Sequence, residues 1–136
     1  MKSSLATRPL TDRERALARW MLENGGPEAR AFLGQLEAAE ATNWRCPCGC
    51  ASFNFKVRGK PSAPPGVHIL GDYVFGTEAN LAGVFIFSSN SILSGVEVYG
   101  LASDAPNVLP EPDVLRSFAT AASDQARQQQ ERTHGA

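Results

Sequence analysis

The sequence predicts an α+β fold in which two N-terminal helices pack on an antiparallel sheet of four to five strands, with a short C-terminal helix. Two observations favour this class. Apolar residues recur at helical spacing up to about residue 40, and from Thr42 onward the spacing changes to two, which is typical of strands. A run of small polar residues, 88–91, then separates two apolar segments and indicates a hairpin. Helices followed by consecutive strands indicate α+β rather than α/β.

The first helix is expected at 12–24. Residues 11–14, Thr-Asp-Arg-Glu, have the S/T-x-x-E form of a capping box, in which two side chains satisfy opposite backbone donors. Gly25 and Gly26 follow the helical pattern. They are interpreted as the end of the helix, where a glycine adopts the left-handed backbone conformation.

A second helix is expected from Pro27 to about residue 40, because proline suits the first helical position. Its apolar stripe consists of Ala29, Phe32, Leu33, Leu36 and either Ala39 or Glu40. Gln35 lies within this stripe, so we expect it to be a buried residue whose side-chain hydrogen bonds tie the helix to the sheet.

Five strands are expected, at 42–46, 53–57, 67–75, 83–87 and 92–99. The segment 59–66 contains three prolines and two glycines, cannot continue a ladder of hydrogen bonds, and is expected to be a loop. A proline-rich crossing loop at 102–112 leads to a last short helix that Asp113 caps.

The chain is expected to form one α+β domain at 10–124, preceded by a flexible N-terminus at 1–9. The residues at 125–136 are rich in Gln and Arg and have almost nothing apolar to bury, so a disordered tail is expected there. At 136 residues the chain is long enough to bury a sizeable core without disulfides.

The composition argues against two classes of partner. Thirteen basic and fourteen acidic residues give a net charge of −1, whereas general nucleic-acid binding needs clustered positive charge. The sequence has no apolar run near the ~18 residues of a membrane span and no apolar core of a signal peptide. These features predict a cytoplasmic protein without a membrane or nucleic-acid partner, and they do not indicate its oligomeric state.

All three cysteines, Cys46, Cys48 and Cys50, lie within five residues at a turn that contains proline and glycine. They could be ligands of a soft metal ion such as zinc, a redox pair with a spare thiol, or small buried groups packed beneath the turn. The spacing is C-x-C-x-C rather than the common C-x-x-C of zinc sites, and a structural zinc ion takes four ligands. His68 is the candidate for the fourth ligand, about twenty residues away.

The layout resembles a group of small uncharacterised bacterial proteins over about residues 10–115. The matching residues are Leu10, Thr11, Glu14, Leu17, Trp20, Leu22, Glu23, Gln35, Leu36, Cys46, Cys48, Gly49, Cys50, Ser52, Phe55, Leu93, Val96, Glu97, Val98 and Tyr99. This chain departs from the pattern at 89–91, where those proteins carry Asp-Gly, and at Val96, where they carry leucine. As a compact α+β domain of nearly neutral charge, the chain is similar, by analogy only, to immunity proteins that neutralise bacterial toxins.

The second candidate site lies on the expected hairpin. If Phe87 pairs with Ile92, the core face carries Phe85, Phe87, Ile92, Val96 and Val98. The opposite face then carries Val84, Ile86, Leu93, Glu97 and Tyr99. It could form a shallow groove in which Glu97 and Tyr99 orient a ligand or partner, or be covered as in a central hairpin.

The sequence has no phosphate loop, no H-E-x-x-H and no G-x-S-x-G, so an enzyme is not expected. It predicts a non-enzymatic, cytosolic bacterial binding protein, of an immunity or regulatory type, that acts by stoichiometric contact with a protein partner and has no required cofactor. Two alternatives remain: a small zinc-binding domain using Cys46, Cys48 and Cys50, and a small-ligand pocket around Glu97 and Tyr99.

Overall fold

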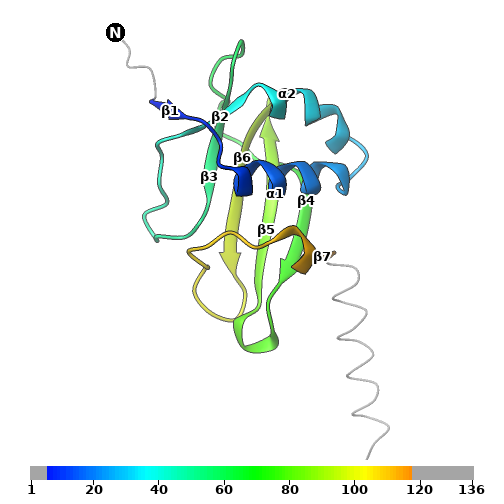
Figure 1. The fold of residues 1–136 in the computed structure, drawn as a ribbon, viewed down its shortest axis with the longest axis vertical. Coiled ribbons are helices and arrows are strands. Elements are labelled where there is room, and N and C mark those ends of the chain that lie inside the picture. Colours follow the sequence, from blue (N-terminus) through cyan, green and yellow to red (C-terminus); the bar gives the residue numbers. More distant parts are fainter. Residues whose placement is uncertain (1–5, 118–136) are drawn as a thin grey trace, which may run out of the picture.

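A computed structural model describes residues 6–117 as one seven-stranded antiparallel sheet with both α-helices on the same face (Figure 1). The strand order is β1-β2-β3-β6-β5-β4-β7. The strands are β1 (Thr7–Arg8), β2 (Ala39–Thr42), β3 (Phe53–Val57), β4 (His68–Phe75), β5 (Ala82–Ser89), β6 (Ile92–Gly100) and β7 (Arg116–Ser117). Four of the five expected strands are confirmed, as β3 to β6.

The predicted fold class is wrong, because the described residues 6–117 form mostly sheet with two short α-helices. These are α1 (Asp12–Glu23) and the single turn α2 (Leu33–Glu37); the 3-10 helices are η1 (Ala29–Phe32), η2 (Glu78–Asn80) and η3 (Pro112–Val114). The expected second helix is divided between η1 and α2, and β2 begins at Ala39, where the helical pattern was expected to continue. The two-residue strands β1 and β7 are too short to show the alternation by which a strand is predicted.

The expected ends of the domain also change. Thr7 and Arg8 pair with Thr42 and Ala41, so the sheet begins within the segment expected to be a flexible N-terminus. The expected C-terminal helix starts as one 3-10 turn, Pro112–Val114, after which the chain extends into β7. The remainder of that helix and the expected tail at 125–136 lie outside the described residues.

Helix α1 begins with the predicted capping box. The Thr11 hydroxyl accepts a hydrogen bond from the Glu14 N–H at 3.0 Å, and the Glu14 carboxylate accepts one from the Thr11 N–H at 2.9 Å. The helix ends at Glu23, and Gly25 and Gly26 are not in the left-handed region. Gly25 is instead required for close packing: a Cβ there would lie 2.5 Å from the Leu70 carbonyl oxygen.

Replacing Gly25 by alanine is expected to lower the free energy of unfolding by about 2 kcal/mol, because backbone atoms cannot move aside for the added methyl group. Gly34→Ala is the matched control: a Cβ at Gly34 meets nothing within 4 Å, so this change should be neutral or slightly stabilising. Urea unfolding measures both variants. Equal effects at the two positions would contradict the close approach of Gly25, just after α1, to Leu70 of β4.

The β5–β6 hairpin has a different register from the expected one. Ser89 pairs with Ile92, and Asn90 and Ser91 form a two-residue turn with φ of 51° and 62°. Positive φ at both positions is typical of a type I′ turn. A bulge between Phe87 and Ser88 places Phe87 opposite Gly95, so the expected Phe87–Ile92 pair is wrong.

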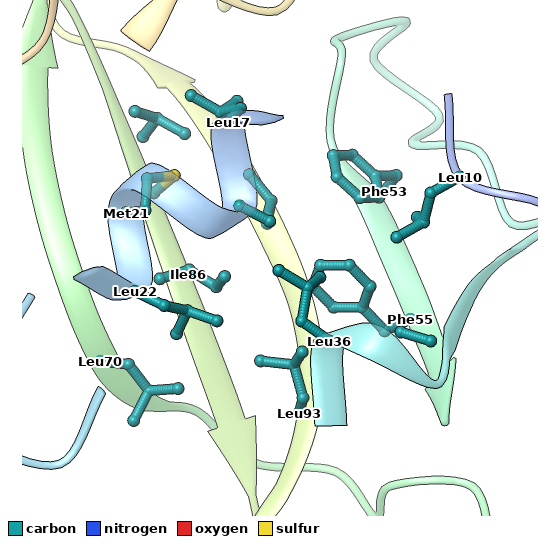
Figure 2. Packing of buried hydrophobic residues seen from close by; sticks show 14 of the residues in the cluster. Leu10, Leu17, Met21, Leu22, Leu36, Phe53, Phe55, Leu70, Ile86 and Leu93 are labelled. Carbon is teal, nitrogen blue, oxygen red and sulfur yellow. The ribbon is translucent and has the colours of Figure 1, made fainter. Parts of the chain in front are cut away.

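The core lies between the helices and one face of the sheet (Figure 2). Leu17, Met21 and Leu22 from α1 and Leu36 from α2 are completely buried in it, together with Ile86 of β5. The predicted tie between the glutamine of α2 and the sheet is confirmed, but its side chain is half-buried rather than buried. Gln35 Oε1 accepts a hydrogen bond from the Leu93 N–H at 2.8 Å, and Gln35 Nε2 donates one to the Ser91 carbonyl at 2.9 Å.

Candidate metal-binding site

The three cysteines lie in the loop between β2 and β3, on a tight turn. The Gly49 N–H donates to the Cys46 carbonyl at 2.9 Å, which places Pro47 at the second position of a β-turn, where its fixed φ is favourable. Gly49 has a φ of +83°, a conformation that other residues rarely adopt. The residues between the cysteines therefore shape the turn, as the sequence indicated.

The turn brings all three thiol groups together. The sulfurs of Cys46 and Cys48 are 2.9 Å apart, and all three Sγ atoms lie within 4.8 Å of one another. Cys48 is exposed, and Cys46 and Cys50 are half-buried. The interpretation that the cysteines are small buried groups packed beneath the turn is therefore wrong, since none of the three is buried. The thiols are close enough together to bind one metal ion.

Ser52 connects the cysteine turn to the sheet. Its hydroxyl accepts a hydrogen bond from the Val98 N–H of β6 at 2.8 Å, and it lies 3.1 Å from Cys50 Sγ. Burial raises the pKa of Cys50, but hydrogen bonds from Ser52 and the neighbouring thiols outweigh burial and lower this pKa to about 7. Cys50 is therefore partly ionised near neutral pH.

Cys48 behaves in the opposite way. Its hydrogen bonds with Cys46 and Cys50 favour the protonated form and raise the pKa of Cys48 to about 11. The cluster therefore loses its protons in separate steps, the first of which falls near neutral pH.

In metal-free protein, alkylation of Cys50 by iodoacetamide is expected to reach half its maximal rate near pH 7, and alkylation of Cys48 only near pH 11. The thiolate is the reacting form, so the lower pKa shifts the rate profile to lower pH. Trypsin releases the three cysteines in one peptide, residues 46–56, whose fragmentation assigns each label. A single common profile near pH 9 would contradict the effect of Ser52 and the neighbouring thiols.

Among residues 6–117, the only cluster of three or more potential metal-ligating side chains consists of Cys46, Cys48 and Cys50. His68, the expected fourth ligand, is not part of this cluster. It begins β4, where its Nε2 atom contacts the Glu28 carboxylate. The fourth position of a tetrahedral ion would therefore require a water molecule or an added ligand.

A cavity of about 510 Å³ adjoins the cysteine turn. Its lining includes Cys46, Cys50, Arg8, Asn43, Arg45 and Asn107. The sequence did not indicate Arg8 or Asn107 as part of this site, because they come from β1 and from the loop before η3 and meet only in the folded chain. In the sequence, the only indication that a charged residue lines this cavity was Arg45, which directly precedes Cys46.

An ion pair supports one side of the cavity. The Arg8 guanidinium donates two hydrogen bonds to the Glu14 carboxylate, both at 2.8 Å. Burial raises the pKa of Glu14, but the hydrogen bonds from Arg8 and Thr11 outweigh it and lower this pKa. Because Glu14 also caps α1, this ion pair holds β1 against the helix. The charge of Arg8 is therefore already paired within the protein.

The four residues of the expected hairpin site lie on opposite faces of the sheet. Ile86 and Leu93 are completely buried in the core. Glu97 and Tyr99 lie on the face away from the helices, where the Tyr99 hydroxyl donates to Asp72 at 3.3 Å. The structure therefore does not bring these four side chains into one groove, and neither Glu97 nor Tyr99 lines the cavity at the cysteine turn.

Comparison of this chain with protein-family models, curated proteins and solved structures finds no match. The resemblance to small bacterial proteins stays a prediction from the sequence. Within residues 6–117, none of the helices combines the length and the apolar character needed to cross a bilayer.

Proposed function

We propose that the protein binds one zinc ion through the thiolates of Cys46, Cys48 and Cys50. The observation that carries this proposal is the convergence of the three Sγ atoms within 4.8 Å of one another. Zinc–sulfur bonds of about 2.3 Å hold the sulfurs of a tetrahedral site about 3.8 Å apart. No two of the three sulfurs are more than 4.8 Å apart, and the Cys46 and Cys48 sulfurs, which are 2.9 Å apart, would separate by about 0.9 Å to reach this value.

The chemistry of the donors supports the same proposal. Metal binding requires thiolates, and Cys50 is already partly ionised near neutral pH because its pKa is lowered to about 7. A bound cation would also favour ionisation of the other two thiols. Three protein ligands leave one position of a tetrahedral zinc ion for water or a small ligand, and the cavity beside Cys46 and Cys50 gives such a ligand room.

The proposal is tested by metal analysis and thermal unfolding. Protein saturated with zinc and then desalted is expected to retain one zinc ion per chain, and a chelator is expected to lower its melting temperature. The variant with serine at all three cysteines should retain no zinc and show no response to chelator. Substoichiometric zinc, with a melting temperature indifferent to chelator, would contradict the proposal.

A second candidate function is non-enzymatic, stoichiometric binding of a protein partner through the sheet face opposite the helices. Three aromatic rings lie side by side there: Phe85 is 5.6 Å from Phe87 and 5.9 Å from Tyr99 between ring centres. All three are only partly buried, and the carboxylates of Asp72 and Glu97 lie on the same face. A partner with apolar side chains flanked by lysine or arginine would fit this surface.

Affinity purification from the native host, with neighbouring genes intact, tests this second function. Phe85→Ala and Phe87→Ala are expected to lose a partner that the unchanged protein retains. Arg30→Ala, an exposed change in η1 on the helix side, is the control and should retain it. Equal recovery with all variants, or recovery of no partner, would count against binding at this face.

A further inference from the structure

We propose that the cysteine turn and its cavity form a thiol–disulfide exchange site, in which a small disulfide carrying carboxylate groups oxidises Cys46 and Cys48. This inference goes beyond metal binding. It concerns the same sulfurs, but it requires no metal ion, so each proposal can fail without the other.

The geometry selects Cys46 and Cys48 as the pair. Their sulfurs are 2.9 Å apart, so forming an S–S bond of about 2.05 Å requires an approach of about 0.9 Å. The turn closed by Gly49 holds the two residues in this arrangement. Cys50 differs, because its sulfur contacts the Ser52 hydroxyl, which is itself hydrogen-bonded to Val98 of β6.

The reaction proceeds in two exchange steps. Cys46, which lines the cavity, attacks one sulfur of the small disulfide as a thiolate; a mixed disulfide forms and one small thiolate leaves. Cys48 then attacks the Cys46 sulfur, which forms the Cys46–Cys48 disulfide and releases the second small thiolate. The two cysteines lose two electrons to the small disulfide, and their two protons appear on the two released thiols.

The cavity indicates the class of disulfide. Its volume of about 510 Å³ falls within the range of about 300–1,000 Å³ typical of small-molecule sites. Arg45 lines it and forms no ion pair with any residue in the described part of the chain. The side-chain amides of Asn43 and Asn107 add hydrogen-bond donors to the same walls. A free guanidinium with nearby amides favours carboxylates.

The test compares two small disulfides of opposite charge on metal-free protein in the presence of a chelator. Oxidised glutathione carries carboxylates, and cystamine carries only ammonium groups. We expect both disulfides to oxidise the chain, which then loses two hydrogen atoms. Oxidised glutathione should react about fivefold faster, because a fivefold ratio corresponds to an ion pair of about 1 kcal/mol. Arg45→Gln should abolish this preference, and Arg58→Gln, an exposed change at a residue that does not line the cavity, should keep it.

To assign the bond, the remaining free thiol is alkylated, the disulfide is reduced and labelled with a second reagent, and the peptide of residues 46–56 is fragmented. A Cys46–Cys48 disulfide, formed also in Cys50→Ser, supports the proposed pair. A Cys48–Cys50 or intermolecular disulfide, or three free thiols after treatment, would overturn it. Equal rates with the two disulfides, unchanged in Arg45→Gln, would overturn the assigned class of substrate. Zinc binding is measured separately on reduced protein, so its absence would bear only on the proposed metal site.

Discussion

Serine at any one of Cys46, Cys48 or Cys50 is expected to lower the zinc affinity of the chain more than 100-fold, equivalent to more than about 2.7 kcal/mol. Each change replaces a soft thiolate with a hydroxyl that remains protonated at neutral pH. Only three protein ligands are available in the cluster, so the loss of any one cannot be compensated by another. Competition with a chromophoric chelator measures the affinity.

Two variants provide graded controls for this prediction. Ser52→Ala removes the hydroxyl beside Cys50 but no ligand, and a loss of roughly 10- to 100-fold is expected, as for other groups that hydrogen-bond to a ligand. Arg45→Gln should leave zinc affinity unchanged. Because none of the three cysteines is buried, circular dichroism should show that the serine variants remain folded. A loss confined to one cysteine would contradict shared coordination.

Leu36→Ala is expected to lower the free energy of unfolding by about 3 kcal/mol. Leu36 is completely buried, and Figure 2 shows its side chain between the helices and strand β6, near Leu93 and Phe55. A single helical turn such as α2 has no stability of its own, so its position depends on what it packs against. The truncation removes the main apolar contact that attaches α2 to the sheet and leaves a cavity.

The matched control is Leu33→Ala, in the same short helix but only partly buried, with an expected cost of about 1 kcal/mol. Urea unfolding with a constant m-value compares the two variants. If Leu36→Ala cost no more than Leu33→Ala, the docking of α2 on the core would be wrong. The effect should also be independent of zinc, since Leu36 lies outside the cysteine turn.

Several elements could be predicted because their signals are local. The capping box at Thr11 and Glu14 requires only residues three apart, and the turn at Pro47 and Gly49 requires only four consecutive residues. The longer strands β3 to β6 show their alternation within their own segments. The clustering of the three thiols follows from the same short range, since side chains two and four residues apart around a turn can hardly separate.

The rest depended on contacts between distant segments. Strands β1 and β7 exist only because the neighbouring strands β2 and β4 offer edges with which two residues can pair. The bulge after Phe87 shifts the register of the hairpin. A shift of one residue moves every side chain of a strand to the other face of the sheet. For this reason Ile86 and Glu97 were predicted on the same face, although they point to opposite sides.

The cavity beside the cysteines shows the same division. The closeness of the three thiols follows from the sequence alone, because covalent spacing and turn chemistry are sufficient for that. By contrast, Arg8 of β1 and Asn107 of the loop before η3 share a cavity with the thiols only because the chain folds. The contact of Cys50 with Ser52, which is hydrogen-bonded to β6, depends on the fold in the same way. Local spacing limits how far neighbouring groups can be apart, whereas groups a hundred residues apart meet only when the whole sheet has formed.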